Sequence, residues 1–182
     1  RWFAYATGRR EAWIADAEAG RVLAGPLNLN QPCRNLSMDP RGTLLLSIGV
    51  GGHLQLWAAA SGRLLATNSS VPNARAAYFS PDASFMLVQL GGTESQLLDA
   101  TNLTSRGAPF TNYEPFAVPF RPDGKALVLR YDRAWRVWDT VTGLALADPG
   151  ASPGVIEDGA WSPDGRGVIA CSSSPSTLFS GF

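Results

Sequence analysis

The sequence is poor in the side chains that most often carry chemistry: its 182 residues include one histidine, one lysine and two cysteines. A single histidine excludes a metal site built from several imidazoles, and His53 has no serine or cysteine near it in the context of a nucleophile. Cys33 and Cys171 lack the spacing of a metal knuckle or a redox pair, so both are expected to be buried thiols. We therefore predict no metal, no cofactor and no enzyme activity.

The chain also lacks an excess of charge and a long apolar run. Its 15 basic and 15 acidic residues cancel, which argues against a nucleic-acid-binding face. No apolar stretch approaches the ~18 residues that a membrane span requires, so no membrane insertion is expected. Localisation stays open, with the cytoplasm favoured. All basic residues but Lys125 are arginine, a bias typical of a GC-rich genome and hence of a bacterial source.

What the sequence does contain is an internal repeat with two landmarks. The first is a turn that follows a bulky apolar residue, and its prolines stand 41 residues apart, at Pro40, Pro81, Pro122 and Pro163. The second is a dipeptide that reads Trp-Asp in its clearest copy, at Ala15-Asp16, Trp57-Ala58, Leu98-Asp99 and Trp138-Asp139. Five residues after its first member stand Gly20, Gly62, Leu103 and Gly143. Two landmarks with one period indicate stacked copies of one structural unit.

Between the landmarks, short apolar runs bounded by Gly, Pro, Ser or Asp predict β-strands. They cover residues 44–48, 85–90, 126–131 and 167–171, and then 12–15, 53–57, 95–98 and 135–138. No stretch shows a sustained helical period. Asp82, Asp123 and Asp164 follow the landmark prolines, and we expect them to bond to their own turns rather than to cations. A repeat of four short strands predicts an all-β fold built of β-propeller blades.

The repeat resembles the WD-repeat family, particularly its bacterial form. The resemblance rests on segments 56–62, 79–82, 120–124 and 137–143, and the last repeat, at 160–165, is also similar to TolB-type propeller repeats. It implies that the landmark prolines, Trp57, Trp138 and Asp139 belong to the structural frame. The family's Gly-His pair is absent, so we expect its buried network of His, Asp, Ser and Trp not to assemble, and apolar packing to hold the blades.

We expect residues 1–182 to form a single propeller segment. With strands named a to d from the axis outward, its parts are strands b to d of one blade (1–27), three blades (28–68, 69–109 and 110–150) and an incomplete blade (151–182). The length of 182 residues holds about 4.4 repeats of 41, whereas propellers close with ~4 to 8 whole blades. The expectation is therefore a segment of a larger propeller, of about seven blades.

Variable residues on this repeated frame mark the candidate binding surface. Six residues before the landmark prolines stand Arg34, Arg75, Phe116 and Glu157, which we expect near the rim of the central channel. Phe110 and Tyr113 join Phe116 in an aromatic group that could anchor a partner. Packing between blades is the alternative for the aromatic residues, and a solvated pair is the alternative for the two arginines.

The sequence thus predicts a non-enzymatic scaffold or sensor that binds protein partners, or other domains of its own chain, through loops at one end of the propeller. The resemblance implies a setting beside bacterial Ser/Thr kinases or nucleotide-switch ATPases. The alternative is an accessory propeller of a larger enzyme, TolB-like or peptidase-like, or a binder of a small ligand in the central channel. The oligomeric state stays open.

Overall fold

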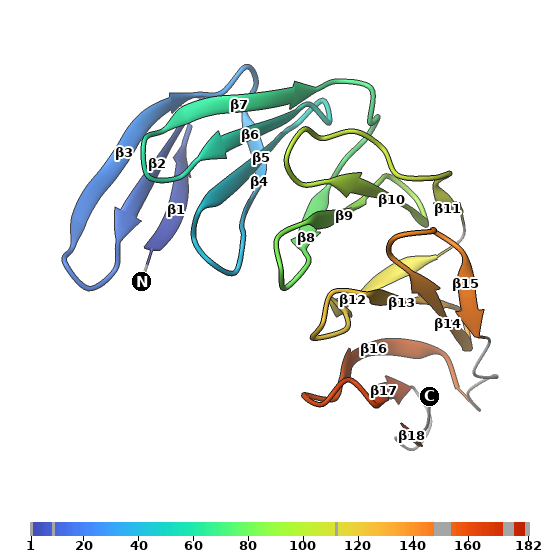
Figure 1. The fold of residues 1–182 in the computed structure, drawn as a ribbon. Coiled ribbons are helices and arrows are strands. Elements are labelled where there is room, and N and C mark those ends of the chain that lie inside the picture. The colour runs from blue at the N-terminus through green and yellow to red at the C-terminus, as the bar shows by residue number, and fades with distance from the viewer. Residues whose placement is uncertain (1, 9, 112, 148–153, 173–176, 181–182) are drawn as a thin grey trace. The chain divides into compact units, whose positions relative to one another are not determined.

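The computed structural model describes residues 2–8, 10–111, 113–147, 154–172 and 177–180. All regular secondary-structure elements in this part of the chain are β-strands (Figure 1), which confirms the all-β fold class. No helix long and apolar enough to cross a membrane occurs in it. The chain divides into two compact units, which are described separately: unit 1 is Arg1–Gly91 with Leu98–Ser105, and unit 2 is Gly92–Leu97 with Arg106–Phe182.

Unit 1 contains two whole sheets and part of a third. The first is β1 (Trp2–Thr7), β2 (Glu11–Asp16) and β3 (Arg21–Asn28); the second is β4 (Cys33–Met38), β5 (Leu44–Gly49), β6 (Leu54–Ala58) and β7 (Arg63–Asn68). Each runs antiparallel in chain order. The third begins with β8 (Ala76–Phe79) and β9 (Phe85–Gln89), which also pair antiparallel. This succession of small antiparallel sheets, one of three strands followed by sheets of four, is the pattern of propeller blades.

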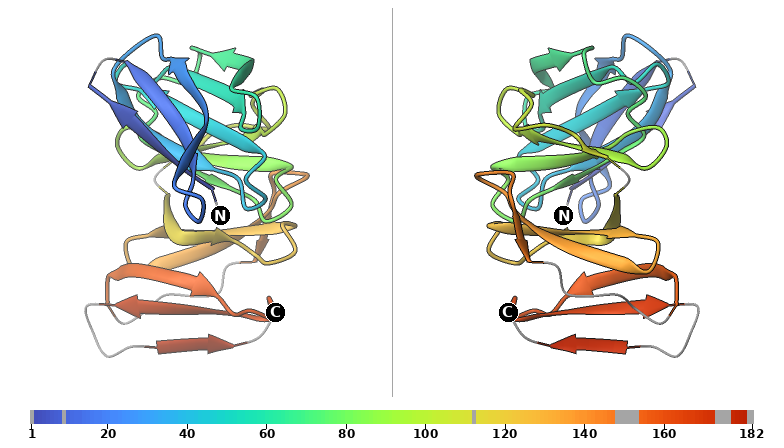
Figure 2. Two further views of the ribbon diagram at one scale, coloured as in Figure 1. Left: turned by 90° about the vertical axis from the view of Figure 1, so that its left-hand side faces the viewer. Right: turned by 90° about the vertical axis from the view of Figure 1, so that its right-hand side faces the viewer.

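Unit 2 repeats the same pattern. Its strands are β11 (Phe110–Thr111), β12 (Glu114–Phe120), β13 (Ala126–Tyr131), β14 (Ala134–Asp139), β15 (Ala145–Ala147), β16 (Ile156–Trp161), β17 (Gly167–Ser172) and β18 (Thr177–Ser180); β10 (Glu94–Asp99) ends in unit 1. In Figure 2 the strands β16 to β18, orange to red, run side by side. A parallel bridge between Val118 and Ala160 joins the inner strands β12 and β16.

The eight predicted strands are all present, and their ends agree within one residue. One boundary of the predicted blades is wrong. Phe110 lies opposite Ser95, so β11 belongs to the sheet of β10 rather than to the blade predicted for 110–150. The reason is the loop after β10, where Ser105 bridges back to Leu98 and delays the outer strand until residue 110.

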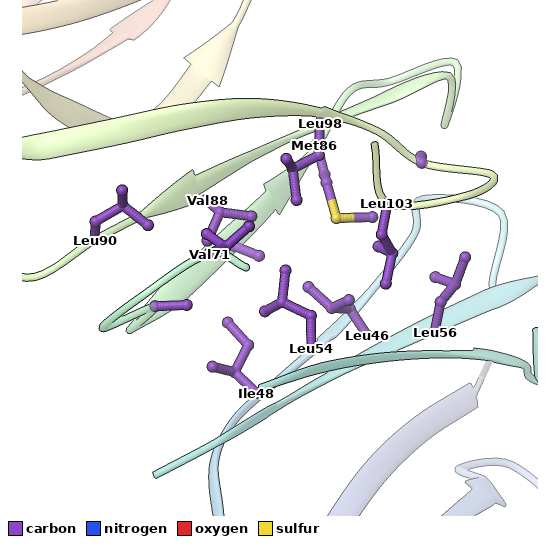
Figure 3. Close-up of a cluster of buried hydrophobic side chains, with 13 residues drawn as sticks. Leu46, Ile48, Leu54, Leu56, Val71, Met86, Val88, Leu90, Leu98 and Leu103 are labelled. Atoms are coloured by element: carbon purple, nitrogen blue, oxygen red, sulfur yellow. The ribbon is translucent and has the colours of Figure 1, made fainter. Parts of the chain in front are cut away.

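Alternate residues of each strand fill the spaces between blades. In unit 1, Leu46 and Leu54 of the second blade pack with Met86 and Val88 of the third (Figure 3). The opposite face of the second blade presents Leu45 and Trp57 to Ala12 and Ile14 of β2. In unit 2, Val128 and Val137 share a buried cluster with Val168 and Ala170 of β17. Two-faced apolar packing therefore holds successive blades together, as expected.

Polar side chains close the turns between the first two strands of each blade. The Ser80 hydroxyl accepts the N–H of Phe85 at 3.0 Å, and Ser162 accepts that of Gly167 at the same distance. Asp164 Oδ1 in turn accepts the Ser162 hydroxyl at 2.6 Å and the N–H of Arg166 at 3.1 Å. The expectation that these aspartates serve their own turns is confirmed for Asp164, and Asp82 and Asp123 bond in the same way.

These turn bonds predict a dependence of stability on pH. The Ser162 hydroxyl and the Arg166 N–H hold the pKa of Asp164 below its usual value, and the N–H of Thr142 does most to lower the pKa of Asp139. A carboxyl group whose pKa is lower in the folded than in the unfolded state stabilises the fold at pH values above its ordinary pKa of about 4. This contribution is lost as the pH falls through the pKa of the folded state. The free energy of unfolding, measured by denaturant unfolding, should fall as the pH is lowered from 5 to 2. Asp139→Asn should make the fall shallower, whereas an unchanged slope would contradict this role.

The last position of the second landmark adopts a left-handed backbone conformation in every copy, including the one copy that has no glycine there. Gly20, Gly62 and Gly143 have φ of 62°, 67° and 69°, in the left-handed region that glycine favours, and Leu103 at the equivalent position has φ of 63°. Its N–H bonds to the carbonyl of Asp99 at 3.0 Å, as the N–H of Gly143 bonds to Asp139. Leu103 is nevertheless retained in a strained conformation because its side chain is buried in the core of unit 1.

The structure corrects two expectations about buried groups. The Ser-Trp part of the polar network is present in the second blade, where Nε1 of Trp57 donates to the Ser47 hydroxyl at 3.0 Å and both residues are buried. Burial raises the pKa of the half-buried Cys33 thiol, but Cys171 is exposed. It lies on β17 with the opposite phase to Val168 and Ala170, and so points away from their cluster.

We expect Ser47→Ala to lower the free energy of unfolding by about 1–3 kcal/mol, because it leaves the buried indole N–H of Trp57 without a hydrogen-bond acceptor. Denaturant unfolding should be compared with Ser69→Ala, at an exposed serine of the same unit, for which a change below about 0.5 kcal/mol is expected. Equal stability of the two variants would show that the Ser47–Trp57 hydrogen bond does not contribute to the free energy of unfolding.

Candidate functional site

The five predicted binding residues have different environments. Arg34 and Arg75 are exposed in unit 1, and Glu157 is exposed in unit 2. Arg34 and Glu157 both lie where the inner strand shifts register against its neighbour, between Cys33 and Asn35 in one case and between Ile156 and Asp158 in the other. These two residues therefore occupy equivalent positions on their inner strands. Tyr113 is half-buried in unit 2, and Phe116 is fully buried.

Phe116 is a core residue, so its assignment to the binding surface is corrected. Its exposed fraction is 0%, and it shares a cluster with Trp135, Ile156 and Trp161. The cause lies in β12, whose pairing with β13 shifts by several residues between Pro115 and Phe120. The two prolines of this strand have no N–H to donate, which favours such an irregularity and turns the Phe116 ring inward.

The other aromatic residues of this region do form a surface group, which we call the aromatic cluster. It consists of four rings and one guanidinium, from Phe110, Tyr113, Tyr131, Trp138 and Arg136. The ring centroids of Tyr113 and Trp138 lie 5.6 Å apart at 81°, an edge-to-face contact, and those of Tyr113 and Tyr131 lie 5.8 Å apart at 56°. Phe110 is buried beneath, with its centroid 4.9 Å from that of Trp138.

Arg136 adds a positive charge to the aromatic cluster. Its Cζ lies 5.7 Å from the centroid of the Tyr113 ring and 5.6 Å from that of Trp138, within the range of cation–π attraction. Arg136 and Trp138 alternate on β14 with the buried Trp135 and Val137. Strand alternation therefore sends one pair into the core and the other pair to the aromatic cluster.

Two contacts fix the loop that carries Tyr113. The buried Ser95 hydroxyl donates to the main-chain carbonyl of Tyr113 at 3.5 Å. The next residue, Glu114, accepts from Nη2 of Arg130 at 2.7 Å, and Nη1 of the same arginine donates to the carbonyl of Ile156 at 2.7 Å. This arginine therefore ties the start of β12 to β13 and β16, so that the Tyr113 ring rests on an ordered base.

Sequence reasoning missed three members of the aromatic cluster: Tyr131, Arg136 and Trp138. Trp138 was assigned, like Trp57, to the structural frame alone. One signal in the sequence distinguishes Trp138 from Trp57: Leu129 stands at the position where the second blade has Ser47. Nε1 of Trp138 is buried and has no hydrogen-bond partner among the described residues, so this indole is held by rings rather than by a hydroxyl.

Cavities and metal sites were also sought in the described residues. A cavity of about 410 Å³ lies between two turns of unit 2, lined by Arg121, Pro122, Asp123, Asp164, Gly165 and Arg166. Arg121 and Asp123 are ion-paired at 2.8 Å, and the Asp164 carboxylate serves its turn, so the carboxylates there are already engaged. No group of three His, Cys, Asp or Glu suited to a metal ion occurs in the described part of the chain.

Comparison with known proteins supports the fold and leaves the family open. No protein-family model matches the sequence, and no curated protein matches it. Among solved structures, the chain is similar to dihydro-heme d1 dehydrogenase NirN in complex with DHE, with a TM-score of 0.70 and 20% identity. The alignment covers 98% of this chain and 41% of that one. At this identity the likeness shows the fold alone: the chain is a partial β-propeller.

Proposed function

We propose that this propeller is a non-enzymatic interaction module that binds a protein partner through the aromatic cluster. One observation carries the proposal: Tyr131 is 52% exposed and contacts the ring of Tyr113, which in turn contacts Trp138 and Arg136. Tyrosine, tryptophan and arginine are the residues most enriched at the energetic centres of interfaces. Their rings give a large contact area at a low cost in side-chain entropy.

The packing beneath the aromatic cluster supports a role in recognition. Phe110 fills the space under Trp138, and the Glu114–Arg130 ion pair holds the base of the loop. A partner that covers these rings would therefore meet a surface already ordered, which lowers the entropic cost of binding. Arg34, Arg75 and Glu157 are exposed charges that we propose as further contacts, effective mainly on the rate of association.

We also propose that the repeat is of the WD type. Two local features support this beyond the sequence landmarks. The Ser47–Trp57 bond is part of the network expected of that family. Asp139 closes the turn after its strand by accepting the N–H groups of Val141 and Thr142, at 2.9 and 2.7 Å.

The binding proposal can be tested with a phage-displayed library of linear peptides selected on the wild-type chain. Peptides that bind should lose at least tenfold in affinity, about 1.4 kcal/mol, against the double variant Tyr113→Ser/Tyr131→Ser. The loss is expected because both rings leave the contact area while the buried residues stay in place. Titration calorimetry gives the affinity, and a thermal melt confirms that the variant is folded.

The matched control is Val141→Ser, which removes an exposed apolar side chain from a turn of the same unit. It should leave peptide affinity unchanged. A separate charge reversal, Arg34→Glu with Arg75→Glu, reports whether these positions contribute. Selected peptides that bind the double tyrosine variant as tightly as the wild type would refute the aromatic cluster as the binding surface.

A second candidate function is that of an accessory propeller within a larger enzyme. It is favoured by the likeness to a dehydrogenase of which this chain covers 41%. The sequence on either side of these residues in the gene separates the two: a kinase or switch-ATPase domain supports the interaction module, and a hydrolase or oxidoreductase domain supports the accessory role.

A further inference from the structure

The two tyrosines of the aromatic cluster carry hydrogen-bond donors that the rest of the described chain does not use. Neither the hydroxyl of Tyr113 nor that of Tyr131 has a partner among the described residues. Water reaches both groups, since Tyr131 is 52% exposed and the Tyr113 hydroxyl is not enclosed. A partner that covers these rings must therefore offer acceptors to two hydroxyls, because a hydroxyl buried without a hydrogen bond weakens binding.

The strands under the aromatic cluster leave no free sheet edge for the partner at Tyr131 or Trp138. Tyr131 ends β13, which pairs with β12 on one side and with β14 on the other. Trp138 lies on β14 and is paired with Leu127 of β13 and with Ala145 of β15. A peptide that binds as an additional strand needs an unpaired edge. That mode of binding is therefore closed at these two rings.

The tyrosine hydroxyls also separate a helical partner from an extended one. The carbonyl groups inside an α-helix are bonded within the helix, so a helix laid over the rings offers the hydroxyls only its side chains. A polyproline II segment has no internal hydrogen bonds, and each of its carbonyls is free to accept. Its prolines also pack well on aromatic side chains, as in other domains that bind proline-rich segments. Of the two conformations, polyproline II is the one that satisfies both the rings and the hydroxyls.

Arg136 determines which charge the aromatic cluster accepts. Its Cζ lies 5.7 Å from the centroid of the Tyr113 ring and 5.6 Å from that of Trp138. The electron-rich ring faces that attract cations are thus already beside a cation of the chain itself. A lysine, an arginine or a methylated lysine of the partner would meet a like charge there, which opposes binding. The cluster therefore favours an uncharged ligand over a basic one.

The other charges beside the aromatic cluster are balanced. Glu114 is ion-paired with Arg130 at 2.7 Å. The turn between β13 and β14 holds Asp132 and Arg133, which are both exposed and of opposite sign. No excess of carboxylates there attracts a basic segment, so the rings and their hydroxyls decide what binds.

We propose that the aromatic cluster binds a proline-rich segment of its partner, in the polyproline II conformation and without a basic residue at its centre. The inference rests on the proposed function, because it names the chemistry that the same surface takes. The Tyr113 ring is tilted by 56° against Tyr131 and by 81° against Trp138, so the rings form a ridged surface for pyrrolidine rings to pack against. The two tyrosine hydroxyls donate to carbonyls of the bound segment.

Titration of the whole chain with decaproline, followed by NMR chemical shifts, tests this proposal. Decaproline should bind, whereas a decapeptide of alternating glycine and serine should not. Tyr113→Phe/Tyr131→Phe keeps both rings and removes both hydroxyls, and it should weaken decaproline binding at least fivefold, because two hydrogen bonds are lost. Tyr5→Phe makes the same change at an exposed tyrosine of unit 1 and should bind decaproline like the wild type.

Three results would overturn this inference and leave the proposed function standing, provided that library-selected peptides still require the two tyrosines. One is a lack of decaproline binding at millimolar concentration. Another is equal binding of decaproline to the wild type and the double phenylalanine variant. The third is a trimethyl-lysine peptide that binds more tightly than decaproline, which would assign the rings to a cation. Library peptides that bind Tyr113→Ser/Tyr131→Ser as tightly as the wild type would instead refute both proposals.

Discussion

Phe116→Ala is expected to lower the free energy of unfolding by about 3–5 kcal/mol, the largest effect predicted for any substitution in unit 2. The side chain has no exposed surface and packs with Trp135 of β14 and with Ile156 and Trp161 of β16. Removing the ring leaves a cavity at their meeting point. Urea unfolding, with the slope checked for two-state behaviour, gives the value directly.

Tyr113→Ala is the matched comparison, because it removes an aromatic ring from the same loop region but from the half-exposed aromatic cluster. It should cost clearly less than Phe116→Ala. Similar costs for the two would mean that Tyr113 is also a packing residue, and would remove it from the proposed binding surface.

Gly159→Val is expected to destabilise the protein by about 2–3 kcal/mol through overpacking. A Cβ at this position would lie 2.7 Å from the carbonyl oxygen of Ile169 and 2.9 Å from Cε2 of Phe116. The carbonyl belongs to the paired strand β17 and cannot move without breaking the sheet. Glycine is therefore required here by the close approach of both the Ile169 carbonyl and the Phe116 ring.

A double-mutant cycle separates the two contacts of this glycine. If the ring is the main obstacle, Gly159→Ala should cost less in a Phe116→Leu background than in the wild type, with a coupling of at least about 0.5 kcal/mol. Additive costs would assign the strain to the Ile169 carbonyl alone. Unfolding curves of the four proteins decide between the two.

The strands were predictable because their signals are local. Glycine, aspartate or serine after each short apolar run, and prolines 41 residues apart, locate both ends of β5, β9, β13 and β17 to within one residue. The position of β11 was not predictable, since this strand has only two residues, Phe110–Thr111, and so offers no apolar run to mark it.

The candidate site was predictable only in part. The repeat pointed to the loop before β12, and Tyr113 lies there, but alignment by position cannot show which way a side chain turns. Pro115 and Pro119 disturb the pairing of β12, so Phe116 enters the core where Arg34 and Glu157 stay at the surface. Tyr131 and Arg136 come from other strands, and only the folded sheet brings them to Tyr113.

Hydrogen–deuterium exchange of the wild-type chain, with and without a peptide selected on it, tests the central claim most directly. The account predicts slower exchange on binding at residues 113–114 and 130–136, the segments that carry Tyr113, Tyr131 and Arg136. Protection confined to the strands around Arg34 and Arg75, with no change at either segment, would contradict it.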